Sequence, residues 1–264
     1  MAYARSTDDG GFTVRLDPAT LPAGPLDFVA RLRRDPKERE IRVPVPGDGL
    51  VTLAPDAHSL AEGRWDCYVA PHGTDRRRRL RCGLAERARR VGASPRVGPD
   101  GVAAWLPYAT SDGFLALRTW LRPAHAEVLH VEAGPERAVV GAQLLGLRGG
   151  LDGARVVAVA RSGAERDFSV PAARVGDGHF EFTLPYAQAG GPGGDDGRDD
   201  WVLWLHRTAP AAAPVPIGRI GSDVLDRNKT DLFPQGHGGV GLHFTGAHDL
   251  GVRVRAQDVV TQVT

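Results

Sequence analysis

Short stretches in which apolar and polar residues alternate run through nearly the whole chain, and clusters of Gly, Pro, Asp and Asn separate them. A period of two is typical of half-buried β-strands, whereas the 3.6-residue period of an amphipathic helix is almost absent. Sixteen strands are predicted, over residues 12–16, 27–33, 39–44, 49–54, 64–70, 78–82, 101–106, 113–121, 139–147, 154–161, 166–171, 178–184, 201–206, 216–220, 240–245 and 249–256. The pattern predicts an all-β protein with one short helix over 84–91.

The two halves of the chain share a motif. Residues 38–44 have the sequence EREIRVP and residues 165–171 have ERDFSVP, so acid, base, acid, apolar, polar, Val and Pro follow in the same order at an offset of 127. Similarity at a fixed offset indicates an internal repeat.

A tryptophan-to-threonine spacing recurs as well. Trp65 precedes Thr110 by 45 residues, and Trp201 precedes Thr245 by 44. A turn, an aliphatic strand and an arginine follow each threonine. The second copy carries a Gly- and Asp-rich insert, 189–200, which we assign to a surface loop between two strands.

The repeat predicts two domains. We expect a first β-sandwich repeat over 1–125, a linker over 126–136 where Pro and charged residues join the copies, and a second repeat over 137–264. Each copy has the length and strand number of an immunoglobulin-like or fibronectin-like β-sandwich. The tryptophan near the middle of each domain is expected to anchor its core.

The composition is that of an ordinary globular protein, with 264 residues, 42% hydrophobic and 25% charged. Basic residues (33) and acidic residues (32) nearly balance, so we predict no nucleic-acid partner. The sequence shows neither a signal peptide nor an apolar run that could span a bilayer, which predicts a cytoplasmic protein without a transmembrane segment. In the reducing cytoplasm we expect Cys67 and Cys82 to be free thiols.

Residues 63–69 (GRWDCYV), and the segments from Tyr108 to Thr119 and from Phe244 to Val254, resemble β-sandwich modules of actinobacterial CDP-glycerol glycerophosphotransferase and glycosyltransferase proteins. In those proteins the modules accompany the catalytic domain of a teichoic-acid-like polymerase. The resemblance implies an accessory role in cell-envelope glycopolymer biosynthesis, with the glycopolymer or a glycosyl- or glycerophosphotransferase as partner. It carries over no catalytic residue, because repeat and linker leave no room for the α/β catalytic domain.

A run of arginines is the main concentration of positive charge. If 78–82 is a strand, Arg77, Arg79 and Arg81 share one face and can hold phosphates or carboxylates of an anionic polymer through bidentate contacts. Together with Tyr108 they form our candidate anion- or glycan-binding site. An exposed aromatic pair beside Arg77 and Arg79 would support it, and the alternative is a charged hairpin that protects a sheet edge.

A second candidate site would lie between the repeats and would consist of acidic residues and histidines, namely Asp223, Asp226, His237 and His243. Such groups support acid–base chemistry if the fold gathers them in a cleft. A transferase-type enzyme is therefore an alternative function, and a deep polar pocket with converging carboxylates would favour it. His243 and His248 flank a predicted turn and could share a metal ion, but we favour solvated turn histidines.

Common catalytic motifs are missing from the sequence, including G-x-S-x-G, the Walker phosphate loop, H-E-x-x-H and C-x-x-C. We therefore predict a non-catalytic accessory or binding protein associated with glycopolymer transferases, without a cofactor or a metal. A third hypothesis is a structural protein-interaction module that uses unpaired sheet edges.

Overall fold

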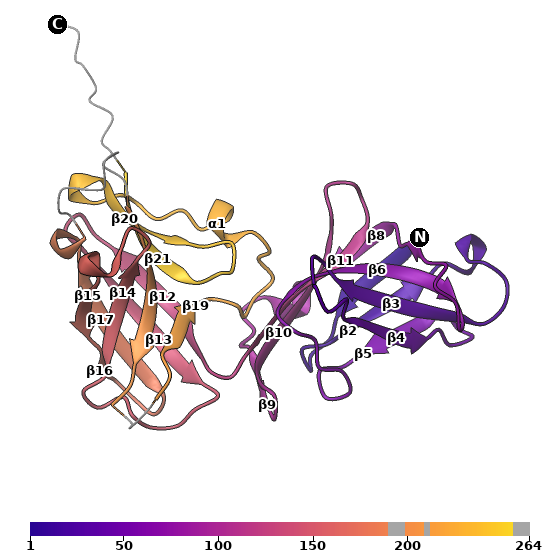
Figure 1. The fold of residues 1–264 in the computed structure, drawn as a ribbon, viewed down its shortest axis with the longest axis horizontal. Coiled ribbons are helices and arrows are strands. Elements are labelled where there is room, and N and C mark those ends of the chain that lie inside the picture. Colours follow the sequence, from indigo (N-terminus) through magenta and orange to yellow (C-terminus); the bar gives the residue numbers. More distant parts are fainter. Residues whose placement is uncertain (190–198, 209–211, 256–264) are drawn as a thin grey trace, which may run out of the picture. The chain divides into compact units, whose positions relative to one another are not determined.

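The structure is a computed structural model that describes residues 1–189, 199–208 and 212–255 (Figure 1). Strands dominate it, and the one α-helix among these residues is the four-residue α1 (Arg227–Thr230), so the all-β prediction is confirmed. Most of the predicted loop 189–200 lies outside the described residues. The chain divides into two compact units: unit 1 comprises Met1–Pro123 and Gly221–Leu225, and unit 2 comprises Ala124–Ile220 and Asp226–Thr264.

Unit 1 contains two sheets. Hydrogen bonds give the strand orders β5-β2-β1-β8 and β4-β3-β6-β11-β10-β9, with the short β7 paired to β6. The strands are β1 (Ala2–Ser6), β2 (Phe12–Leu16), β3 (Leu26–Leu32), β4 (Glu40–Pro44), β5 (Leu50–Leu53), β6 (Gly63–Pro71), β7 (Arg78–Arg79), β8 (Cys82–Glu86), β9 (Arg96–Gly98), β10 (Gly101–Ala109) and β11 (Leu115–Arg122), and the 3-10 turns are η1 (Pro18–Thr20) and η2 (Ala88–Arg90).

Unit 2 has one sheet in the order β15-β14-β18-β19-β12-β13-β17-β16, to which β21 adds beside β18 and β20 beside β21. Its strands are β12 (His125–Ala133), β13 (Arg137–Leu145), β14 (Arg155–Ala160), β15 (Phe168–Pro171), β16 (Ala173–Arg174), β17 (His179–Pro185), β18 (Asp199–His206), β19 (Val215–Gly218), β20 (Val240–Phe244) and β21 (Leu250–Val254), and its 3-10 turns are η3 (Ala164–Arg166), η4 (Tyr186–Gln188) and η5 (His237–Gly239).

The same strand pairings occur in both units. The antiparallel pairs β1–β2, β2–β5, β3–β4, β3–β6, β6–β11 and β10–β11 have counterparts in β12–β13, β13–β17, β14–β15, β14–β18, β18–β21 and β20–β21. Even the parallel pair β1–β8 has a parallel counterpart in β12–β19. Strands that follow one another in the first half of the chain therefore pair in the same way as the corresponding strands of the second half.

The units differ in β9, which pairs with β10 in unit 1, in β16, which pairs with β17 in unit 2, and above all in the strand after β6. In unit 1 it is broken, because β7 pairs with β6 whereas β8 pairs with β1, and two sheets remain separate. In unit 2 the single strand β19 pairs with both β18 and β12, which joins the corresponding sheets into one.

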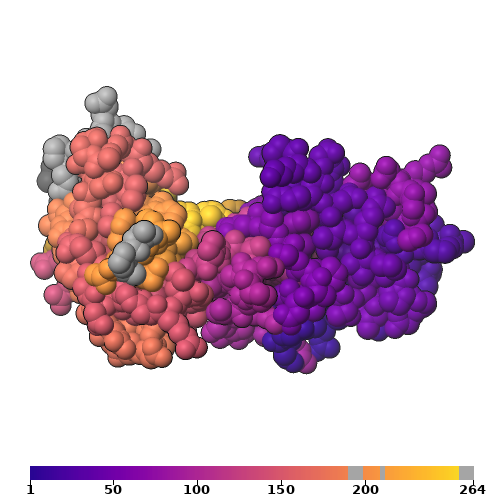
Figure 2. All heavy atoms as spheres, turned by 60° about the horizontal axis from the view of Figure 1, so that its bottom comes forward, coloured from indigo at the N-terminus to yellow at the C-terminus, as the bar shows by residue number. Residues whose placement is uncertain are grey.

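Each core is built around the tryptophan that the repeat predicts. Trp65 and Trp201 are 2% and 1% exposed, within the buried apolar clusters of their own units. The indole nitrogen of Trp65 donates to the hydroxyl of Thr119 at 3.0 Å, and that of Trp201 donates to the carbonyl of Arg166 at 2.9 Å. Both polar atoms are therefore satisfied inside the core. Side chains fill the space between strands on the face of each unit that Figure 2 shows.

The repeated threonines close equivalent turns. The hydroxyls of Thr110 and Thr245 each accept the backbone N–H four residues later, at 3.0 and 3.1 Å. The residue before that donor is Gly113 in unit 1, with φ +76°, and His248 in unit 2, with φ +69°. A left-handed backbone is normally left to glycine, so His248 carries backbone strain in its copy.

Two sequence predictions need correction. Residues 126–136, predicted as a linker, contain most of β12, whose Ala126 and Val128 are buried in the core of unit 2. Its polar residues His125 and Glu127 are buried as well, so a polar sequence here does not mark a linker. The predicted helix over 84–91 is also wrong: residues up to Glu86 belong to β8, held by parallel pairing with β1, and a single 3-10 turn follows.

The position of β12 predicts where the chain can be divided. A fragment of residues 124–264 should give a β-type circular dichroism spectrum and a cooperative thermal transition. A fragment of residues 136–264 should not, because β13 and β19 lose the strand between them and the core loses Ala126 and Val128. Equal melting temperatures for the two fragments would show that β12 is dispensable.

Candidate functional site

The predicted arginines of unit 1 lie against two aromatic rings. Arg79 is paired in register with Tyr68, and Arg81 forms a bridge with Phe114. The guanidiniums of Arg79 and Arg81 lie 4.3 and 4.8 Å from the centre of the Phe114 ring, and that of Arg77 lies 5.9 Å from the Tyr68 ring. Both rings are partly exposed, so two aromatic side chains lie beside these arginines, although neither ring is fully exposed.

Arg77 shares a carboxylate with a second arginine. One carboxylate oxygen of Glu40 accepts a hydrogen bond from Arg77 at 2.8 Å, and the other accepts one from Arg42 at 2.8 Å. Burial alone would raise the pKa of Glu40, but the hydrogen bond and charge of Arg42, with the charge of Arg77, hold it below its ordinary value. Glu40 is therefore ionised at neutral pH, and one negative charge serves two guanidiniums.

Arg79 is held in the same way. Asp66 accepts from Arg79 at 2.7 Å and from Arg33 at 2.6 and 2.9 Å. Arg81 is exposed, and its guanidinium reaches the backbone carbonyl of Asp112 at 3.4 Å. We call this surface the arginine face; its members are Arg33, Arg42, Arg77, Arg79 and Arg81. Its cations outnumber the carboxylates that they contact, which include Glu40, Asp66, Asp75 and, at 3.9 Å, Asp27.

Tyr108, the fourth predicted residue, is only 5% exposed. Its hydroxyl has no hydrogen-bond partner within the described residues, and burial raises its pKa while the charges of Arg64 and Arg33 offset part of the shift. Tyr108 therefore lies close to the arginine face without offering its ring to a ligand.

The residues of the second predicted site are distributed over both units. Asp223 belongs to unit 1, whereas Asp226, His237 and His243 belong to unit 2. Asp226 precedes α1 and lies 3.6 Å from the ammonium of Lys229, and His237 is exposed in η5. Of these four residues, only His243 lines the large cavity of unit 2.

That cavity was not foreseen from the sequence. It has a volume of about 380 Å³, within the range of small-molecule sites, and lies between the segment around α1 and the β20–β21 hairpin. Three guanidiniums, one carboxylate and two amides line it, from Arg161, Arg253, Arg255, Asp231, Asn228 and Gln235. The carboxylate of Asp231 is bound to the guanidinium of Arg227.

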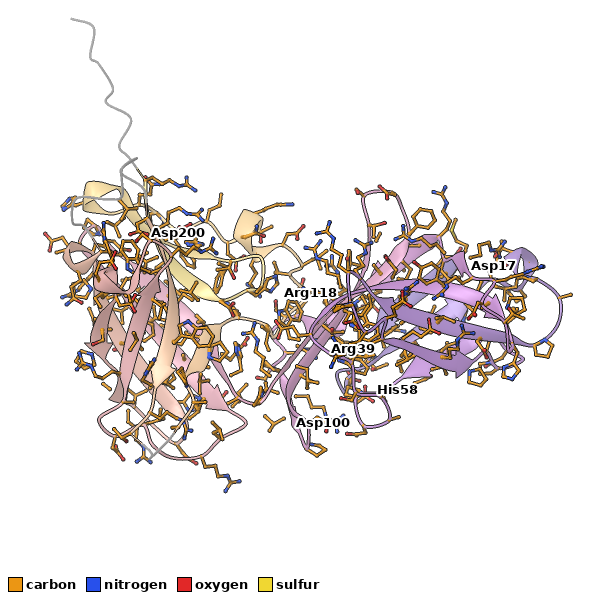
Figure 3. The ribbon with its side chains drawn as sticks, viewed as in Figure 1. Asp17, Arg39, His58, Asp100, Arg118 and Asp200 are labelled. Carbon is orange, nitrogen blue, oxygen red and sulfur yellow. The ribbon has the colours of Figure 1, made fainter. Side chains whose placement is uncertain are left out.

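Asp200, labelled in Figure 3, fixes the cationic wall of the cavity. Arg253 donates to both of its carboxylate oxygens, at 2.6 and 3.1 Å, and Nε2 of His243 lies 3.5 Å away. Burial alone would raise the pKa of Asp200, but Arg253 holds it below its ordinary value. Burial and the charge of Arg253 lower the pKa of His243, so this imidazole is neutral at pH 7.

The cavity lies at the same position of the repeat as part of the arginine face. The backbone N–H of Arg33 donates to the carbonyl of Arg64 at 2.8 Å, and that of Arg161 donates to the carbonyl of Asp200 at 2.9 Å. Arg161 is thus the counterpart of Arg33, and Asp200 is the counterpart of Arg64. Where unit 1 has the guanidinium of Arg64, unit 2 has the carboxylate of Asp200, which forms an ion pair with the neighbouring Arg253.

A glycine helps to open the cavity. Arg118 is paired in register with Arg64 and Leu106, whereas its counterpart Arg253 is paired with Asp200 and Gly241. Leu106 is 1% exposed in unit 1, and Gly241 lines the cavity in unit 2. The loss of the leucine side chain leaves space beside the arginines.

Arg161, Arg253 and Arg255 are not among the site residues predicted from the sequence. One signal was present, because the repeat aligns Arg253 with Arg118 after the two threonine turns. Arg161 is nevertheless about ninety residues from Arg253 and Arg255 in the sequence, and only the pairing of β14, β18 and β21 brings Arg161 and Arg253 to one wall.

Three further observations bear on the predicted chemistry. Within the described ranges, no group of three or more His, Cys, Asp and Glu residues could hold a metal ion. Cys67 and Cys82 are free thiols, and burial raises the pKa of the Cys67 thiol. No helix in the described part of the chain is long and apolar enough to cross a membrane.

Comparisons with known proteins give little further guidance. No protein-family model matches the chain, and no curated protein matches it in sequence. Among solved structures, S. aureus TarS is similar over 70% of this chain and 35% of that chain, with 14% identity and a TM-score of 0.33. A fragment of TarS is similar over 69% of this chain and 54% of that chain, with 14% identity and a TM-score of 0.34. The chain therefore spans about a third to a half of these structures, and such TM-scores do not establish a common fold.

The Asp200–Arg253 pair predicts a pH-dependent contribution to stability. Because the pKa of Asp200 is lowered in the folded protein, its carboxylate stabilises the fold above its ordinary pKa of about 4 and loses this effect as the pH falls below it. Asp200→Asn should cost about 1–3 kcal/mol at pH 7 and progressively less between pH 5 and pH 3. Thermal unfolding across this range measures the difference.

The matched control is Asp177→Asn. Asp177 is exposed, and its carboxylate makes no hydrogen bond or ion pair with any described residue. This substitution should leave the melting temperature unchanged at every pH. A constant difference between Asp200→Asn and the native protein from pH 7 to pH 3 would contradict the role of the charge.

Proposed function

We propose that the protein is a non-catalytic accessory protein that binds an anionic cell-envelope glycopolymer and works beside the transferase that makes it. In this proposal, both units are divergent copies of one immunoglobulin-like or fibronectin-like β-sandwich, and β12 belongs to the second. The shared strand pairing of the units supports the duplication.

One observation carries the binding function: arginines stack on a partly exposed aromatic pair on one surface of unit 1. Tyr68 and Phe114 each leave part of their ring exposed, and the guanidiniums of Arg77, Arg79 and Arg81 lie over these rings. Aromatic rings favour contact with the apolar face of a sugar, and guanidiniums bind phosphate or carboxylate oxygens in pairs. Aromatic rings and guanidiniums are both needed to bind a polymer in which sugars alternate with negatively charged groups.

The ion pairs within the arginine face are compatible with this role. Glu40 and Asp66 hold Arg77 and Arg79 in place, so less side-chain entropy is lost when a ligand binds. The guanidinium of Arg81 lies over Phe114 and reaches a backbone carbonyl, and it forms no ion pair with a described residue. A polymer would bind first to Arg81 and then share the other guanidiniums with the carboxylates.

The transferase alternative has weaker support. It requires converging carboxylates in a deep polar pocket, and the cavity that contains His243 is lined by three arginines and one arginine-bound aspartate. Such a lining favours the binding of an anion over acid–base chemistry by carboxylates. The cytoplasmic location and the transferase partner remain part of the proposal.

The proposal predicts that the Arg77→Ala, Arg79→Ala, Arg81→Ala triple variant loses affinity for an anionic glycopolymer. The salt concentration that elutes the variant from immobilised teichoic acid should be at least twofold lower than for the native protein, because three charge-assisted contacts disappear. A neutral dextran column should retain neither protein.

A second triple variant controls for net charge. Arg5, Arg15 and Arg89 are exposed arginines of unit 1 outside the arginine face, and their replacement by Ala removes the same charge. This variant should elute close to the native protein. If both triple variants lose retention equally, or if neither does, the arginine face is not the binding surface.

A further inference from the structure

We infer that the cavity of unit 2 is a second, separate binding site, and that its ligand is a small phosphorylated sugar whose phosphoryl group contacts Arg161 and Arg255. The inference does not rest on the proposed function, because the residues involved belong to the other unit. It concerns a single small ligand in a cavity, whereas the arginine face is an open surface.

The charge of the cavity selects an anion. Among its lining residues, Arg253 is neutralised by Asp200 and Asp231 by Arg227. The side chains of Arg161 and Arg255 make no hydrogen bond or ion pair within the described ranges, and both residues are exposed. The charge of Arg161 interacts with Asp200 at longer range, but neither guanidinium forms an ion pair with a described residue. Two such guanidiniums at the rim of one cavity favour a doubly charged group such as a phosphate monoester.

The remaining walls suit the sugar. Asn228 and Gln235 are exposed amides that line the cavity, and an amide can both donate to and accept from a hydroxyl group. Phe233 is partly exposed and also lines it, with its ring 5.8 Å from that of Phe244. An apolar ring beside amides fits a ligand that has hydroxyl groups and a C–H face.

The site is largely preformed. Phe233 packs on Phe244 and thereby holds the segment after α1 against β20, and the guanidinium of Arg227 lies over the same Phe244 ring at 5.7 Å. Asp200 fixes Arg253 through two hydrogen bonds. Binding would order mainly the two exposed arginines, so little affinity is lost to reorganisation.

Isothermal titration of the full-length protein tests the inference. The probes are glucose 1-phosphate, inorganic phosphate, glucuronate and glucose. We expect the tightest binding for glucose 1-phosphate, binding at least tenfold weaker for inorganic phosphate and for glucuronate, and no binding for glucose at the same concentrations. Glucuronate distinguishes a carboxylate from a phosphate, and inorganic phosphate distinguishes an anion site from a sugar-phosphate site.

Two variants locate the binding. Arg161→Gln removes a guanidinium at an exposed position and should weaken glucose 1-phosphate at least tenfold. Gly241→Leu restores the residue that unit 1 has as Leu106; a Cβ at Gly241 meets its nearest neighbours at 3.5–3.6 Å, so it should fit, fill the cavity and abolish binding. Arg174→Gln, an exposed arginine of unit 2 bound to Asp152, is the matched control and should bind normally.

The inference is overturned if glucose 1-phosphate does not bind, if glucose binds as well as its phosphate, or if Arg161→Gln and Arg174→Gln behave alike. Because Arg161→Gln leaves the core intact, a folding defect in Gly241→Leu does not affect this conclusion. The triple variant of the arginine face should bind glucose 1-phosphate like the native protein, so failure of the proposed function and failure of this site give different results.

Discussion

The register in which β6 and β18 lie between their neighbours determines the rest of the structure. Trp65 is paired with Leu32 and Leu117, and Trp201 occupies the same position in unit 2. Because side chains alternate along a strand, placing the tryptophan in the core sends the residue on either side of it to the opposite face. Asp66 and Asp200, which hold the arginines of the two units, occupy such positions. A slip of one residue would bury these charges and expose the indoles.

Two local changes turn one framework into two kinds of site. In unit 1 the strand after β6 is broken, and the residues at the break, Arg79 to Arg81, bring guanidiniums over Phe114. In unit 2 the corresponding strand β19 is continuous and contains no arginine. There Gly241 stands where unit 1 has Leu106, and a cavity lies beside Arg253. The result is an open basic surface in one copy and a solvent-accessible basic cavity in the other.

The alternation of apolar and polar residues was enough to predict most strands and the core tryptophans, because both depend on local pattern and spacing. It failed for strands such as β1, β8 and β12. β8 becomes a strand through parallel pairing with β1, and β12 through antiparallel pairing with β13 together with a short parallel pairing with β19. The arginine face was predictable because three of its members are near neighbours in the sequence. The cavity was not, because Arg161 and Arg255 lie almost a hundred residues apart and meet only through the topology.

In our proposals, the same outward face of each copy carries an anion site, and the two sites take different ligands. Nuclear magnetic resonance of the arginine Nε–H groups in the full-length protein tests it most directly. Glucose 1-phosphate should shift the signals of Arg161 and Arg255 and leave that of Arg81 unchanged, whereas a teichoic-acid oligomer should shift Arg81. Signals that move together with both ligands, or with neither, would contradict the account.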